Sequence, residues 1–435
     1  MNRKFRLAFA LAPFALLAVG AARAEPYLVA DFDTGDVLMQ SDATEPWFPA
    51  STTKLMTTYV ALNAVREGRL TMDTPLTMSA RAARLPPSKM GFRPGTLVTL
   101  DNALKMLMVK SPNDVAWMIA ESIDGSVDKF AAEMNATAAK LGMHESHFVN
   151  PNGLHDPNHY SSARDLAVLT RALLKDFPEH ADLYDIGELQ FGRQIIRNHN
   201  GMLGRYPGAD GMKTGFTCPA GWNIVATADR NGRKLIVVIL GAPSPRTRND
   251  EAAMLFDRGF EMSPAGPKLD ALPASSVTAP PDMRNEICRG QGRAQMAAMQ
   301  EEFVSSAMAQ SSSALASEHN PLAMLAAAMG ASPAAAIAPL PARTIKFDPV
   351  PVFIGPKPGW TGPILAATGD AQEPAPSPVS AYAGDKDAKP DQAAAPLALK
   401  SAVKPLARFR RRHLTPQARA RMAAAVHRVA KKRRH

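Results

Sequence analysis

Phe48-Pro49-Ala50-Ser51-Thr52-Thr53-Lys54 is the stretch that decides the fold, and an apolar-rich run from Leu55 to Val65 follows it. Proline is disfavoured inside a helix but tolerated just before one, so we expect a helix to begin near Ser51. The Ser51 hydroxyl then lies where unpaired backbone N–H groups and the positive end of the helix dipole favour developing negative charge. Lys54 follows one turn later on the same helix face. This pairing of a hydroxyl with an amine predicts a nucleophile and its base.

The spacing Ser-x-x-Lys is common by itself, and Ser126-Val127-Asp128-Lys129 repeats it on what we interpret as a solvated helix face. Ser51 differs because two further polar motifs follow it in the chain. The first, Ser111-Pro112-Asn113, connects helices expected at Asn102 to Val109 and Val115 to Ile123. On a tight connection such side chains can point into a cleft, although Ser and Asn are also ordinary helix N-caps.

Lys213-Thr214-Gly215 is the second of these motifs. Two strand patterns follow it, Trp222 to Ala228 and Lys234 to Leu240, and the Asn231-Gly232 turn between them is typical of a β-hairpin. The motif is therefore predicted to begin an edge strand of an antiparallel sheet, where Gly215 lets another backbone approach closely.

The rest of the chain divides into a regular part and an irregular part. A first hairpin is expected at Tyr27 to Phe32 and Asp36 to Gln40. Further helical patterns cover Val127 to Leu141, Ala163 to Leu174 and Asn249 to Phe260. From Met262 onward Pro and Ala dominate and strong periodicity is lost, which indicates linker-like or disordered sequence. Within that part helical patterns cover Arg293 to Met308, Pro321 to Met329 and the basic segment Leu414 to Lys432.

The N-terminus has the pattern of a targeting segment. A charged start, Met1 to Arg6, precedes an apolar run from Leu7 to Ala22 and the small-residue site Ala22-Arg23-Ala24. This pattern predicts a secretory signal peptide that ends at Ala24. The alternative is an uncleaved anchor, but the run is short for a membrane span and Pro13 interrupts it. We therefore expect a protein that is exported to a bacterial periplasm.

The formal net charge of +10 is concentrated at the C-terminus. Residues 400–435 hold 13 of the 50 Lys and Arg residues and no acid, so 37 bases face 40 acids in the rest of the chain. An exported basic tail is predicted to contact anionic membrane or cell-wall polymer, and this compartment disfavours nucleic acid as the partner. The alternative is a charge run that is merely solvated.

Cysteine and histidine suggest neither a disulfide framework nor a metal site. Cys218 and Cys288 could pair in an oxidising compartment, but they lie in regions of different character and we do not expect them to pair. The loop from His144 to Tyr160 is rich in histidine. Nothing places these histidines on one helix face, and no Cys or carboxylate partner stands at ligand spacing, so we predict no metal and no cofactor.

Taken together, Ser51-Thr52-Thr53-Lys54, Ser111-Pro112-Asn113 and Lys213-Thr214-Gly215 resemble the three-motif set of penicillin-recognising serine enzymes. The phrases Asp31-Phe32-Asp33-Thr34-Gly35 and Asn152-Gly153-Leu154 resemble the low-molecular-mass D-alanyl-D-alanine carboxypeptidases in particular. The resemblance implies an α/β, penicillin-recognising serine transpeptidase-like fold. In it an antiparallel sheet is flanked by helices, and a helical subdomain is added.

The resemblance covers roughly Glu25 to Phe260. It divides the chain into a signal peptide (1–24), a D,D-peptidase catalytic domain (25–262), a Pro/Ala-rich region (263–399) and a basic tail (400–435). The chain departs from the Ser-Asp-Asn form of the middle motif, because Pro112 stands between the two polar residues. Nothing after Met262 resembles the β-rich second domain or the amphipathic anchor of better-known members.

The family's chemistry implies a role for each polar motif residue. Ser51 would attack the carbonyl between the two terminal D-alanines of a peptidoglycan stem peptide and form an acyl-enzyme, while Lys54 takes its proton. The positive charge of Lys213 would help to keep Lys54 neutral. Ser111 would relay a proton to the leaving amine, and Asn113 would hold the substrate amide.

The same resemblance assigns the binding of the substrate's chain end. Lys213 and Thr214, on the strand that contains Gly215, would bind the free carboxylate by charge-assisted hydrogen bonds. Arg248 would reinforce this pocket, or is an ordinary surface arginine. The backbone N–H groups of Phe216 and of the nucleophile would hold the oxyanion.

A β-lactam would acylate the same serine. Between Asn150 and Thr170 there is no Glu of the kind that class A β-lactamases use for deacylation, so the resemblance implies an inhibited target and not a resistance enzyme. Within the fold, the alternatives are a D,D-endopeptidase or a weak transpeptidase. In a different class, the alternative is a non-catalytic cell-envelope-binding protein.

Overall fold

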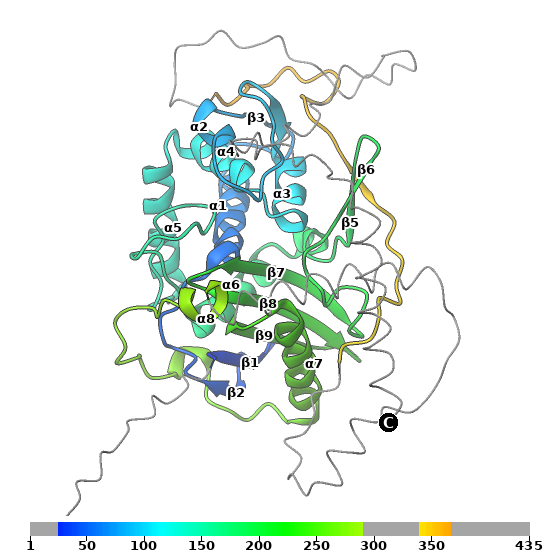
Figure 1. The fold of residues 1–435 in the computed structure, drawn as a ribbon. Coiled ribbons are helices and arrows are strands. Elements are labelled where there is room, and N and C mark those ends of the chain that lie inside the picture. Colours follow the sequence, from blue (N-terminus) through cyan, green and yellow to red (C-terminus); the bar gives the residue numbers. More distant parts are fainter. Residues whose placement is uncertain (1–24, 290–338, 367–435) are drawn as a thin grey trace, which may run out of the picture. The chain divides into compact units, whose positions relative to one another are not determined.

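A five-stranded antiparallel sheet with the order β2-β1-β9-β8-β7 forms the centre of the structure (Figure 1). The structure is a computed structural model that describes residues 25–289 and 339–366. The sheet contains β1 (Tyr27–Asp31), β2 (Val37–Ser41), β7 (Ala209–Thr217), β8 (Gly221–Arg230) and β9 (Arg233–Ala242). The expected hairpins are confirmed, and β7 lies at the edge that the Lys213 motif predicted.

Strand β9 shows why the sheet is covered on both faces. Ile236 and Val238 belong to one hydrophobic cluster, whereas Val237 and Ile239 belong to another, as the two-residue period of a strand requires. Helix α7 (Pro245–Glu261) packs on the face that the second cluster covers. Helix α6 (Ala163–Asp176) packs against β9 with the first cluster.

A helical subdomain extends beyond the β7 edge of the sheet (Figure 1). It contains η1 (Ala50–Thr53), α1 (Lys54–Arg66), α2 (Ala80–Ala83), α3 (Leu100–Val109), α4 (Asn113–Asp124) and α5 (Val127–Leu141). Helix α1 contacts α3, α4, α5 and α6 and is buried over most of its length, which explains its apolar sequence. The α/β fold class with a helical subdomain is confirmed.

Side-chain caps begin several of these helices at the residues where the sequence offers them. Thr99, Ser126, Ser162 and Ser244 each accept a hydrogen bond from a backbone N–H in the first turn of the helix that follows. The hydroxyl of Ser126 caps α5 by accepting from the backbone N–H of Lys129. The second Ser-x-x-Lys sequence is therefore a helix start on the surface.

Shorter elements join the larger ones. They are β3 (Pro75–Thr77) paired with β4 (Leu97–Thr99), η2 (Pro178–Leu183), and β5 (Glu188–Phe191) paired with β6 (Gln194–Arg197). Strands of three or four residues contain at most two repeats of the two-residue period, which is too few to be recognised in the sequence.

The expectation that order ends at Met262 is wrong for two segments. Residues 263–289 contain η3 (Leu269–Ala271) and α8 (Arg284–Cys288), and residues 339–366 contain β10 (Val350–Val352). Single apolar side chains anchor these Pro-rich segments by burial: Leu269, Ile287, Leu340 and Val352. The helices expected at 293–308, 321–329 and 414–432, the segment 1–24 and the basic tail lie outside the described residues.

The expectation that the cysteines stay unpaired is also wrong. Cys218, in the turn between β7 and β8, forms a disulfide with Cys288 at the end of α8. Helix α8 docks on that turn, where the backbone N–H of Met283 donates to the carbonyl of Pro219 over 3.0 Å. The two cysteines are 70 residues apart in sequence, so only the fold brings them together. Among the helices of residues 25–289 and 339–366, none has the length and apolarity to cross a membrane.

Candidate active site

Ser51 and Lys54 lie where the short helix η1 passes into α1. The Nζ atom of Lys54 lies 2.9 Å from Ser51 Oγ, 3.0 Å from Asn113 Oδ1 and 2.6 Å from the carbonyl oxygen of Asn152. The Nδ2 group of Asn113 donates to the carbonyl of Pro86, so its Oδ1 is the atom that faces Lys54. Three oxygens thus surround one amine, and one of them is the predicted nucleophile.

The number of donors on Lys54 matters for its contact with Ser51. Asn113 Oδ1 and the Asn152 carbonyl can only accept hydrogen bonds, so they take two N–H groups of the amine. A neutral amine has two N–H groups and one lone pair. In that state the lone pair is left for the Ser51 hydroxyl, which then donates to Nζ. The surroundings therefore orient a neutral Lys54 as a base toward Ser51.

The electrostatics of the site favour this neutral state. The side chain of Lys54 is fully buried. Burial lowers the pKa of Lys54 well below its ordinary value, and the nearby charge of Lys213 lowers it further, while Asp114 opposes the shift. Two causes out of three, including the largest, thus promote the deprotonated amine.

A close backbone contact fixes the position of the η1 turn. Gly153 has a φ of +80°, and a Cβ atom there would lie 1.8 Å from the carbonyl oxygen of Ala50. Only glycine has both the backbone freedom and the space at this point. The loop that supplies the Asn152 carbonyl therefore packs directly against the residue that precedes Ser51.

Ser111 occupies the connection between α3 and α4 with a φ of +60°, which is uncommon for a residue with a side chain. It is 4% exposed, and its Oγ atom has no hydrogen-bond partner. The Ser111 hydroxyl therefore makes no hydrogen bond to Ser51 or Lys54 in this structure. Backbone strain of this kind is concentrated at functional sites.

Asp114 is a buried carboxylate that sequence reasoning missed. It accepts hydrogen bonds from the backbone N–H groups of Met90, Gly91 and Val115. The backbone N–H of Asn113 also donates to the carbonyl of Ser88 over 2.6 Å. These bonds hold the loop from Pro86 to Gly91 against the start of α4. The sequence offered only an acid beside a helix start, which is typical of a cap.

Strand β7 brings the third motif to the nucleophile. A Cβ atom on Gly215 would lie 2.8 Å from the carbonyl oxygen of Pro49 and 2.9 Å from the backbone nitrogen of Ser51. Glycine is therefore required for the strand to reach η1. The Nζ of Lys213 donates to the carbonyl of Thr214 over 2.8 Å, and burial, followed by the charge of Arg248, lowers the pKa of Lys213 to about 7. Thr214 is also buried.

Arg248 is a buried residue, so its interpretation as a surface arginine is wrong. It is 3% exposed and donates to Asn249 Oδ1 and to the carbonyl of Asn223. Burial lowers the pKa of Arg248 to about 9. Phe216 stacks on Trp222 with 4.0 Å between ring centroids, at the end of β7 beyond Gly215.

His159, one of four histidines in the loop between α5 and α6, is hydrogen-bonded to other parts of the protein through both ring nitrogens. His159 Nδ1 accepts from the backbone N–H of Val149, so its proton is on Nε2, which donates to Thr53 Oγ1 over 2.8 Å. Burial lowers the pKa of His159 to about 3. Within the part of the chain that the structure describes, no group of His, Cys, Asp and Glu is arranged to hold a metal ion.

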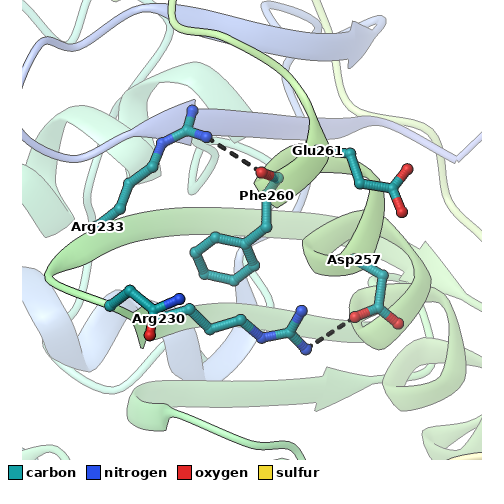
Figure 2. A pocket seen from close by; sticks show the side chains of 6 residues that line it. Arg230, Arg233, Asp257, Phe260 and Glu261 are labelled. Carbon is teal, nitrogen blue, oxygen red and sulfur yellow. Dashed lines mark hydrogen bonds and ion pairs between the residues drawn. The ribbon is translucent and has the colours of Figure 1, made fainter.

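A hollow of about 660 Å³ lies at the turn between β8 and β9 (Figure 2). Figure 2 shows the ring of Phe260 between the side chains of Arg230 and Arg233. Arg230 is ion-paired with Asp257 and Arg233 with Asp31. The residues that line this hollow include no hydroxyl or thiol side chain.

Comparison with known proteins gives a consistent result. The family model described as D-alanyl-D-alanine carboxypeptidase matches residues 15–244. The D-alanyl-D-alanine carboxypeptidase DacA of Haemophilus influenzae is 35% identical over 242 residues, which are 54% of this chain and 62% of that protein.

Solved structures agree with the sequence comparison. Penicillin binding protein 5 from Haemophilus influenzae matches with a TM-score of 0.53 and 34% identity, covering 55% of this chain and 71% of that one. The ampicillin-bound form of Penicillin-Binding Protein D2 from Listeria monocytogenes matches with a TM-score of 0.50 and 28% identity, covering 54% of this chain and 96% of that one. The chain spans about three fifths of the length of the first curated relatives that it matches. On the match to the family model, this chain belongs to the D-alanyl-D-alanine carboxypeptidase family of peptidases.

Proposed function

We propose that the protein is a serine D-alanyl-D-alanine carboxypeptidase that removes the terminal D-alanine from peptidoglycan stem pentapeptides. The observation that carries this proposal is the buried amine of Lys54, 2.9 Å from Ser51 Oγ, with two acceptor-only oxygens on its other sides. Such an amine activates a serine without histidine or metal. The curated relatives are named for the same activity.

Acylation begins with the transfer of the Ser51 proton to Lys54 Nζ. The Ser51 oxygen then attacks the carbonyl carbon between the two D-alanines. The C–N bond breaks, the terminal D-alanine leaves after its nitrogen accepts a proton through Ser111, and the rest of the peptide stays as an ester on Ser51. Asn113 holds the substrate amide beside this ester. Water later takes the place of the amine and releases the shortened stem peptide.

The β7 edge supplies the groups that recognise a chain end. The backbone N–H groups of Ser51 and Phe216 hold the oxyanion, and such donors are typically worth about 3 kcal/mol each. Lys213 and Thr214 bind the free carboxylate, with Arg248 behind them. Because burial lowers the pKa of Lys213 to about 7, binding of an anion beside it favours its charged form.

β-Lactams are proposed to acylate Ser51 and to leave it slowly. The relative from Listeria monocytogenes is described with ampicillin and with cefotaxime bound. No Glu lies between Asn150 and Thr170 that could activate a deacylating water. The enzyme is therefore a target of these compounds.

We also infer an exported protein of the cell envelope, on the sequence patterns of residues 1–24 and 400–435. The tail is proposed to contact anionic membrane or cell-wall polymer through its basic residues.

The substrate proposal is tested by incubating the purified chain and its Ser51→Ala variant with stem pentapeptides and with cross-linked muropeptide dimers. We expect free D-alanine from pentapeptides with the unchanged enzyme and none with the variant. Cleavage of dimers in preference to pentapeptides would make the protein an endopeptidase. A lack of any product from either substrate would favour a non-catalytic envelope-binding protein.

A further inference from the structure

Residues 339–366, here called the strap, return to the catalytic domain after an intervening segment of sequence. The strap begins on α7. The backbone N–H of Leu340 donates to Asp250 Oδ1 over 2.7 Å, and Arg205 donates to the carbonyls of Leu340 and Pro341. Leu340 is 6% exposed and packs in the cluster that α7 shares with the sheet. This end of the strap is therefore attached to α7 at Asp250, which follows Arg248 by two positions in the sequence.

The next anchor is an aromatic ring in a notch made by two glycines. A Cβ atom on Gly187 would lie 2.1 Å from the ring of Phe347, and one on Gly204 would lie 2.8 Å from it. The backbone N–H of Thr344 donates to the carbonyl of Gly204 over 2.8 Å. The ring therefore fits only because these two positions lack side chains.

The strap then continues as a strand. β10 pairs in parallel with β5, with Val350 opposite Leu189 and Val352 opposite Phe191. Val352 is 1% exposed and belongs to the main hydrophobic core, while Pro351 is exposed, as alternation along a strand requires. A peptide that adds a strand to a sheet edge obtains affinity from its backbone and specificity from alternate side chains.

The strap ends on the helical subdomain. The backbone N–H of Gly355 donates to the carbonyl of Leu97 in β4, and that of Leu365 donates to the carbonyl of Pro75 in β3. The backbone N–H of Phe353 donates to the side-chain oxygen of Asn102 over 3.2 Å. Asn102 lies in α3, the helix that ends directly before Lys110 and Ser111.

We propose that the strap is a positioning element that ties α7, which carries Arg248, to α3, which leads into Ser111, and so sets the positions of these two residues relative to each other. The effect on catalysis that we expect from this role rests on the proposed function. The strap is hydrogen-bonded to α7 and to α3, so we expect it to act on Arg248 and Ser111 through these helices. A displacement of about 1 Å in such groups can cost about a hundredfold in rate.

The experiment uses the full chain with the strap released in two independent ways. Phe347→Ala removes the ring, and Gly187→Ala fills the notch without changing the strap. The matched controls are Ile345→Ala and Pro351→Ala, which change exposed positions of the same strap. Hydrogen exchange of the strap amides verifies that the first two variants release it and that the controls do not.

Two measurements then decide the proposal. Hydrogen exchange of residues 106–110, at the end of α3, reports how readily that end of the helix opens, without any reference to activity. The second-order rate of acylation by a fluorescent penicillin reports the reactivity of Ser51. It is measured per folded molecule and well below the unfolding temperature. We expect faster exchange at 106–110 and an acylation rate lower by about tenfold in both release variants, with no change in the controls.

The outcomes separate the strap from the proposed function. A released strap with unchanged exchange at 106–110 and an unchanged acylation rate would overturn the proposal, and lower thermal stability alone would assign the strap a purely structural role. If the unchanged protein fails to react with penicillin, the proposed function fails. In that case exchange at 106–110 still supports or overturns the tie between α7 and α3.

Discussion

Two lysine side chains, Lys54 and Lys213, are buried near the same nucleophile, and the charge of one opposes the charge of the other. Burial is the largest cause that lowers the pKa of each. The proposed chemistry needs different states of the two, because Lys54 acts as a neutral base and Lys213 as a cation. The positive charge of Lys213 disfavours a second charge on Lys54, so a neutral Lys54 beside a charged Lys213 is the favoured arrangement of the pair.

The pH profile of acylation by penicillin should be bell-shaped. The acid limb reflects protonation of Lys54, and the alkaline limb reflects loss of charge on Lys213, whose pKa is about 7. Replacing Lys213 by Arg keeps the positive charge at higher pH, so the alkaline limb of Lys213→Arg should move upward while the acid limb remains. Stopped-flow acylation over the pH range checks this. An alkaline limb that is identical in both proteins would contradict the role of Lys213.

The same buried lysine should also affect stability. Between the folded pKa of about 7 and the ordinary value of 10.5, the unfolded chain binds a proton that the folded chain does not, so the contribution of Lys213 to stability rises with pH. Below the folded pKa of about 7, Lys213 is protonated in both states, so the free-energy cost of burying its charge is present in full. We expect Lys213→Met to unfold at a higher temperature than the unchanged protein at about pH 6, with the difference shrinking toward about pH 10. Calorimetry that finds a constant difference would refute this explanation.

At the scale of elements, the loop from Pro86 to Gly91 depends on one carboxylate. Asp114 accepts three backbone N–H groups, two of them from the loop. In Asp114→Asn one oxygen becomes an NH₂ group that faces these donors, so we expect a loss of about 1–3 kcal/mol in the free energy of unfolding. Urea denaturation measures the loss, and hydrogen exchange should locate the loosening in the loop. A variant of unchanged stability would contradict this role of Asp114.

Sequence patterns predicted the helices and hairpins whose signals come from residues close together in the chain. The helices expected at Asn102 to Val109 and Asn249 to Phe260 are observed at Leu100–Val109 and Pro245–Glu261, and the expected Asn231-Gly232 turn joins β8 to β9. The three motifs predicted Ser51, Lys54 and Asn113, which the structure joins by hydrogen bonds. Ser111 was also predicted, but its hydroxyl meets no partner.

What sequence could not predict depends on distant parts of the chain. The Asn152 carbonyl acts through its backbone, so its residue type carries no sign of the contact with Lys54. Burial of Arg248 depends on the packing of α7 on β8, which brings the carbonyl of Asn223 to its side chain. The strap was missed because its single buried side chains are separated by prolines and show no period over a useful length.

At the scale of the molecule, the disulfide joins the turn after β7 to the sequence that follows α7. Cross-linking residues 70 positions apart restricts the unfolded chain, so replacing both cysteines by serine should lower the free energy of unfolding by about 2–4 kcal/mol. Chemical denaturation with and without a thiol reductant checks this. The reductant should destabilise the unchanged protein and leave the double variant unaffected. Equal sensitivity of both proteins to the reductant would show that the bond does not stabilise the fold.

The whole molecule thus places a nucleophile between a helical subdomain and the edge of a sheet, and holds both sides by contacts outside the site. The proposed mechanism depends on an uncharged Lys54 amine that takes the proton of Ser51. The most direct test is the rate at which penicillin forms an ester on Ser51, followed by intact mass and peptide mapping, in the unchanged protein, Ser51→Ala and Lys54→Arg. Arginine keeps the donors but cannot act as a base. We expect one adduct on Ser51, none in Ser51→Ala, and a rate lower by about 10²–10⁴-fold in Lys54→Arg. An adduct on another residue, or an unchanged rate in Lys54→Arg, would contradict the account.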